Sequence, residues 1–121
     1  MSEQVKKITE VDYLWLFYET YAEERAKAEK GQYISPEYIQ GRVREKIGDA
    51  TVITNTKNEE IHESKAFNAY TKHTNELKAL FDAGDKDKFA EIVCGERELI
   101  DAYYEEKRKQ EELNKPTASE E

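Results

Sequence analysis

The strongest hydrophobic signal in this chain is Tyr13-Leu14-Trp15-Leu16-Phe17-Tyr18, six consecutive large apolar or aromatic residues. Because 38% of the 121 residues are charged, no other segment offers so much burial energy. Thr9, just before it, is a favourable helix N-cap, and we expect a helix from Glu10 to Lys30 that stops at Gly31. The run is therefore either the centre of the core or an anchor for a partner.

On a helix these six side chains cover more than one face, since Trp15 lies about 100° around the axis from Leu14. One neighbouring helix cannot cover them all. Either the helix is central and packed on several sides, or part of its surface binds a protein. For the second case the predicted protein-binding residues are Tyr13, Trp15 and Tyr18, because Trp and Tyr are the usual anchors of protein interfaces.

The remaining helices are indicated by capping signals. Ser35-Pro36-Glu37 combines an N-cap serine, a proline suited to the first helical position and an early acid, so it predicts a second helix, which ends at Gly48. Asn58 is expected to cap a third helix that runs to about Asp82. Asp85 is expected to cap a fourth, with a kink at Gly95 and a charged extension to residue 114.

One segment favours extended structure. Thr51-Val52-Ile53-Thr54 is β-branched throughout, and turn-forming residues follow it at 55–58. A hairpin returning through residues 59–63 stays open as an alternative. The predicted fold class is all-α, an irregular bundle of about four helices with one extended or short-strand connection near residues 49–58. We expect a flexible N-terminus (1–8), a single helical domain (9–114) and a disordered acidic tail (115–121).

Composition narrows the functional class. The net charge is −8 and the pI about 4.9, which argues against direct binding to nucleic acid or to a membrane surface. No apolar stretch approaches the ~20 residues of a membrane span, and Met1–Glu10 is too polar for a signal peptide. A single cysteine, Cys94, forbids an intrachain disulfide. These features predict a cytoplasmic protein, in a cell or in an infected host.

No motif predicts a catalytic site, a metal or a cofactor. Glu59-x-x-His62 matches one half of a carboxylate-bridged di-metal site, but His73 lacks the second glutamate. The acids at Asp82, Asp85 and Asp87 lack calcium-loop spacing and fit helix capping. Cys94 has apolar neighbours and is expected to be a small buried residue. We therefore expect no enzyme activity.

Two functions remain open. The first is a small acidic, non-enzymatic protein-binding module, acting as an accessory adaptor, an inhibitor or an assembly factor, as would suit a phage or mobile-element product; self-association is compatible with it. The alternative is an acidic mimic of nucleic acid that blocks a DNA- or RNA-binding protein. Its predicted surface comprises Glu19, Glu23, Glu24, Asp101, Glu105 and Glu106, although lysines and arginines are interleaved with these acids.

Overall fold

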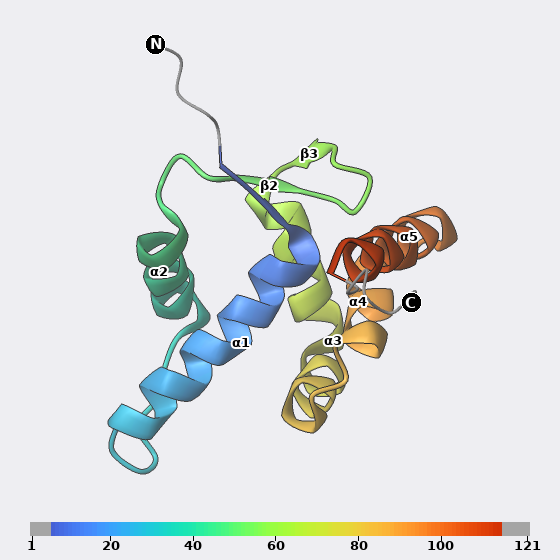
Figure 1. The fold of residues 1–121 in the computed structure, drawn as a ribbon. Coiled ribbons are helices and arrows are strands. Elements are labelled where there is room, and N and C mark those ends of the chain that lie inside the picture. The colour runs from blue at the N-terminus through green and yellow to red at the C-terminus, as the bar shows by residue number, and fades with distance from the viewer. Residues whose placement is uncertain (1–5, 115–121) are drawn as a thin grey trace.

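The computed structural model describes residues 6–114, which form five helices and a small sheet (Figure 1). The elements are β1 (Lys7–Thr9), α1 (Glu10–Lys27), α2 (Pro36–Ile47), β2 (Val52–Thr54), β3 (Glu60–Ile61), α3 (Glu63–Ala83), α4 (Lys86–Cys94) and α5 (Arg97–Asn114). The predicted irregular helical bundle with a strand near residues 49–58 is confirmed. The predictions for residues 1–5 and 115–121 lie outside the described residues.

Helix α1 lies at the centre of the bundle and packs against α2, α3 and α4 (Figure 1). The Thr9 hydroxyl accepts a hydrogen bond from the Asp12 amide at 3.1 Å and so caps the helix as predicted. The helix ends at Lys27, three residues early. The Arg25 guanidinium donates to the carbonyls of Glu29 (2.9 Å) and Gln32 (2.7 Å), which holds the following residues in a turn.

The sheet has the order β1-β2-β3, with β1 parallel to β2 and β2 antiparallel to β3. Residues 7 and 8, assigned from sequence to the flexible N-terminus, instead pair with β2, where Ile8 lies opposite the buried Ile53. A strand of three residues is too short to show an apolar periodicity. The β2–β3 hairpin that the sequence left open is formed.

The third helix begins at Glu63 and is capped by His62, so the prediction of Asn58 as its cap is wrong. Asn58 has φ 68° and lies in the hairpin loop instead. Asparagine tolerates this left-handed conformation at little cost. The neighbouring Asn55 side chain holds the loop together, because its oxygen accepts from the amides of Lys57 (2.9 Å) and Glu59 (3.0 Å).

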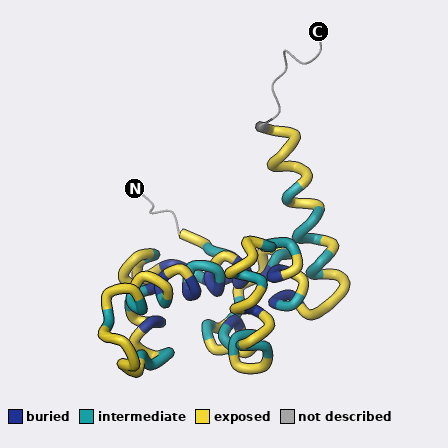
Figure 2. The backbone as a smooth tube through the Cα atoms, turned by 90° about the horizontal axis from the view of Figure 1, so that it is seen from below, coloured by how far each residue is buried: buried dark blue, intermediate teal, exposed yellow. Residues whose placement is uncertain are grey.

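Two backbone irregularities shape the second half of the bundle. Helix α3 is kinked at His73 (φ −129°, ψ 36°). Gly95 adopts φ 76° and separates α4 from α5, where the sequence predicted one kinked helix. Helix α5 packs on α4 and then extends away from the body (Figure 2), and none of its side chains within residues 97–113 is buried.

Candidate functional site

Two of the three predicted anchor residues, Tyr13 and Tyr18, lie in the core. Both are buried, and each hydroxyl has a partner inside the protein: Tyr13 donates to the Glu63 carboxylate, and Tyr18 donates to the Thr74 carbonyl at 3.1 Å. Burial raises the pKa of both phenols. A buried tyrosine with a satisfied hydroxyl stabilises the fold and offers no surface to a partner. Their burial weighs against the prediction that these two side chains bind a protein, although the edge of Tyr18 lines a groove described below.

The third predicted anchor, Trp15, is half-buried between helices. Its ring meets Phe81 of α3 edge-on at 4.8 Å between centroids and Phe89 of α4 at 4.9 Å. The Lys86 ammonium lies over the ring, 5.7 Å from its centroid, in a cation–π geometry. Trp15 thus joins α1 to α3 and α4. This supports the central-helix interpretation of the hydrophobic run.

Exposed aromatic surface lies elsewhere, in a groove between the second half of α1, the connection at 28–35, and α3. We call it the tyrosine groove; its apolar lining includes Phe17, Tyr21, Tyr33, Ile34 and Tyr70. The groove encloses about 600 Å³. Tyr33 and Leu113, each 79% exposed, are the most exposed large apolar side chains among the described residues. Sequence reasoning missed this site because its walls come from three separate segments.

The polar lining of the tyrosine groove is cationic or neutral. It contains Arg25 and Lys78, together with amide and hydroxyl side chains, and no aspartate or glutamate. Arg25 is held by the carbonyls of the 28–35 connection, and Lys78 pairs with Asp82 at 2.8 Å, just outside the groove. The groove thus has no carboxylate in its lining, in a chain with a net charge of −8.

The predicted acidic surface is divided. Glu23 pairs with Lys46 at 2.7 Å and Glu24 with Arg42 at 3.3 Å, so these acids tie α1 to α2. Asp101 pairs with Arg97 at 3.2 Å within α5. The other three acids, Glu19, Glu105 and Glu106, are exposed. Because α2 and α5 lie on opposite sides of α1 (Figure 1), the two groups do not form one continuous face.

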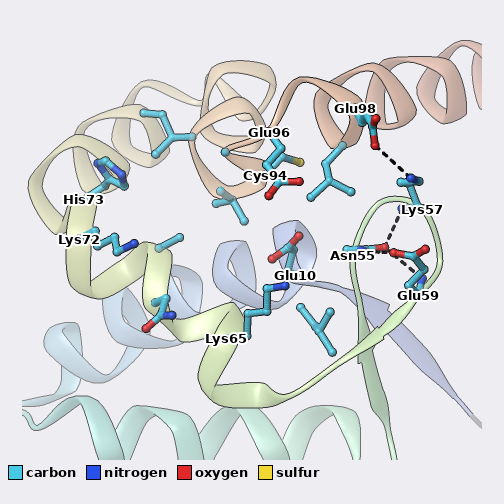
Figure 3. Close-up of a pocket in the computed structure, with 17 residues that line it drawn as sticks. Glu10, Asn55, Lys57, Glu59, Lys65, Lys72, His73, Cys94, Glu96 and Glu98 are labelled. Atoms are coloured by element: carbon cyan, nitrogen blue, oxygen red, sulfur yellow. Dashed lines mark hydrogen bonds and ion pairs between the residues drawn. The ribbon is translucent and has the colours of Figure 1, made fainter.

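A second cavity, of about 380 Å³, lies where the start of α1, the hairpin loop, the first half of α3 and the α4–α5 junction meet (Figure 3). We call it the Glu10 pocket. Its charged lining includes Glu10, Lys65, Lys72, His73 and Glu96, and the Cys94 thiol lies beside them. The two cavities flank the kink of α3, since Lys72 and His73 line this one and Tyr70 and Thr74 line the tyrosine groove.

Among the carboxyl groups of this pocket, that of Glu10 has the pKa that departs most from its ordinary value. Its residue is only 6% exposed, and burial raises its pKa from 4.5 to about 7; the positive charge of Lys65 opposes this rise and the negative charge of Glu96 adds to it. From the sequence, Glu10 was placed at the start of the first helix and was not singled out as a site residue. Its helical spacing to Leu14 and Phe17, four and seven residues on, was the available signal for burial.

The other candidate chemical groups have structural roles. Cys94 is buried, which raises the pKa of its thiol to about 11 and leaves it protonated at neutral pH. Asp85 caps α4 by accepting from the Lys88 amide at 3.2 Å, which confirms the capping interpretation. Glu59 lies in the hairpin loop and His62 caps α3, so they do not share one helix. Within residues 6–114, no group of three or more His, Cys, Asp or Glu is placed to hold a metal ion.

We expect Glu10→Gln to stabilise the protein in a pH-dependent way. Since the pKa of Glu10 is higher in the folded state, its ionisation penalty is absent below about pH 4.5 and complete above about pH 7. The variant should match the wild type at acidic pH and exceed its free energy of unfolding by about 3 kcal/mol at pH 8. Urea unfolding at several pH values measures this difference. A difference independent of pH would contradict it.

Comparison of the chain with known protein families, with curated proteins and with solved structures found no match. Within residues 6–114, every helix is too short or too polar to cross a membrane. The tyrosine groove and the Glu10 pocket, with the charges around them, are therefore the features from which a function can be inferred.

Proposed function

We propose that this protein is a small, non-enzymatic binding module that docks a segment of a partner protein in the tyrosine groove. The observation that carries the proposal is the exposure of Tyr33 (79%) beside a groove of about 600 Å³ that the chain leaves open. Tyrosine is favoured at interfaces because it combines a large apolar ring with a hydroxyl, at a low cost in side-chain entropy.

The lining of the groove indicates the chemistry of the partner segment. An apolar or aromatic side chain would pack between Tyr21, Tyr33 and Tyr70. A neighbouring carboxylate would be attracted by Arg25 and by Lys78, the second of which already pairs with Asp82. We therefore propose a partner segment in which an apolar anchor lies next to an acidic residue.

Such a module would serve as an adaptor, an inhibitor or an assembly factor. The cytoplasm is the proposed compartment, because a chain with one cysteine gains nothing from an oxidising environment. The alternative, mimicry of nucleic acid, requires a continuous acidic face, and the pairing of Glu23 and Glu24 with α2 weighs against it.

The test is to identify the partner and then to measure its affinity for groove variants. A photoreactive amino acid at position 33, expressed in the native host, would crosslink the bound segment for identification by mass spectrometry. With the purified partner, Tyr33→Ala should weaken binding by about 30-fold or more, which corresponds to the ~2 kcal/mol of an interface hot spot. Its melting temperature should stay near that of the wild type, because Tyr33 is exposed.

Leu113→Ala is the matched control, since Leu113 is equally exposed (79%) but lies at the far end of α5. It should leave the affinity unchanged. If instead the double reversal Glu105→Lys/Glu106→Lys abolishes binding and added salt weakens it steeply, the mimic is the correct function. If the crosslinked product is a second copy of this chain, the groove is a dimer interface.

A further inference from the structure

The Glu10 pocket is lined by two acidic and two basic side chains that form no ion pair with the described residues. Several of its charged side chains are bonded to neighbours: Lys57 to Glu98 at 3.3 Å, Glu59 to Asn55 at 2.9 Å, and His73 to Glu76 at 2.7 Å. Four others have no ion pair within residues 6–114: Glu10, which is buried, and Glu96, Lys65 and Lys72, which are exposed to solvent.

Glu10 is the unusual member of this set. Its residue is only 6% exposed, its carboxyl group points into the cavity (Figure 3), where the oxygens are accessible, and no hydrogen bond to it is formed by the described residues. Burial makes ionisation of this carboxyl group costly, and the positive charge of Lys65 offsets only part of that cost. Lys65 extends from α3 toward it without closing an ion pair (Figure 3). A bound cation would remove the cost.

A simple cation would pair with the acidic side chains of the Glu10 pocket but not with its lysines. Lys65 and Lys72 are seven residues apart, so they lie on the same side of α3, two turns from each other. They line the cavity opposite Glu96, which belongs to the α4–α5 junction (Figure 3). A ligand with a single charge would pair either with the two glutamates or with the two lysines, and the other two side chains would stay without a partner. A ligand with both charges satisfies the two sets together.

We propose that the Glu10 pocket binds a small zwitterion of the amino-acid class, with its ammonium group between Glu10 and Glu96 and its carboxylate near Lys65 and Lys72. The ammonium supplies three donors to the two carboxyl groups, and the lysines supply donors to the carboxylate. The volume of about 380 Å³ lies at the lower end of the range for small-molecule sites, as expected for a ligand of this size. This site is distinct from the tyrosine groove, and the two proposals fail independently.

The probes are three ω-amino acids of increasing length, 4-aminobutyrate, 5-aminopentanoate and 6-aminohexanoate, with n-butylamine and butyrate as singly charged counterparts. Titrations at pH 8 would be followed by the backbone amide NMR signals of the full chain. At least one amino acid should cause saturable shifts at pocket residues, such as Ala69, Gly95 and Glu96. Its affinity should exceed that of butylamine and of butyrate by about tenfold or more.

Two variants assign the contacts. Glu10→Gln and Lys72→Met should each reduce the affinity about tenfold or more, whereas Lys88→Met, an exposed lysine outside the pocket, should not change it. Equal binding of butylamine and the amino acids would overturn the role of the lysines and with it the zwitterion. The absence of saturable shifts at millimolar concentration, or saturable shifts at Tyr33 and Tyr70 instead, would overturn the site.

Discussion

Phe17→Ala is expected to lower the free energy of unfolding by about 3–5 kcal/mol, the usual cost of removing a buried large aromatic side chain. Phe17 is 1% exposed, and its ring contacts those of Phe67 (5.3 Å between centroids) and Tyr70 (4.9 Å) on α3. It also meets Tyr18 edge-on at 5.8 Å. The substitution would leave a cavity between α1 and the first half of α3.

Urea unfolding followed by far-ultraviolet circular dichroism measures the effect of this substitution. A domain of this size typically has a total stability of about 5–15 kcal/mol, so the substitution would remove a large fraction of it. Tyr33→Ala is the matched control, because it also removes an aromatic ring but from an exposed position. A loss below about 1 kcal/mol for Phe17→Ala would show that the hydrophobic run is not the centre of the core.

The helices with clear capping signals could be predicted from the sequence. Helix α2 extends from Pro36 to Ile47 between the cap Ser35 and Gly48, as the Ser-Pro-Glu pattern indicated. Both ends are set by local chemistry: the Ser35 hydroxyl accepts from the Tyr38 amide at 3.1 Å, and Gly48 adopts φ 97°. Local chemistry of this kind is readable from a single sequence because it involves residues three or four positions apart.

Elements that depend on distant partners could not be predicted. β1 exists because Lys7–Thr9 pairs with Val52–Thr54, more than forty residues away in the chain. Asn58 and His62 are both acceptable caps, and the choice depends on where the hairpin closes. Asn58 itself is part of that closing loop, at φ 68°. Register and pairing are tertiary properties, which local propensity does not contain.

For the candidate sites, too, the features set by local sequence could be predicted and those set by distant segments could not. The run at residues 13–18 was correctly identified as the main source of burial, but a helical projection could not tell a core face from a binding face. Glu23 and Glu24 looked like free surface acids until α2 supplied Lys46 and Arg42. Both cavities collect side chains from segments far apart in the sequence, so no spacing rule could have found them.

Trp15→Ala is expected to lower the free energy of unfolding by about 3 kcal/mol, at the lower limit for large aromatics because the side chain is only half-buried. The loss comes from the edge-on contacts with Phe81 and Phe89 that hold α1 against α3 and α4. Lys86→Ala removes the cation–π contact together with the ion pair from Lys86 to Asp12 (2.7 Å), and it should cost no more than about 1 kcal/mol. Circular dichroism during urea unfolding suits both variants, since Trp15 is the chain's one tryptophan and its fluorescence is lost on substitution.

The same variant distinguishes the two interpretations of the hydrophobic run. If Trp15 packs the bundle, Trp15→Ala lowers the melting temperature, and Trp15→Phe, which keeps an aromatic ring against Phe81 and Phe89, recovers most of the loss. If Trp15 is a binding anchor, the variant instead keeps the wild-type stability and loses the partner. Because Tyr33→Ala is expected to do the opposite of Trp15→Ala in both measurements, stability and affinity data for these two variants together decide whether a partner binds at the hydrophobic run or at the tyrosine groove.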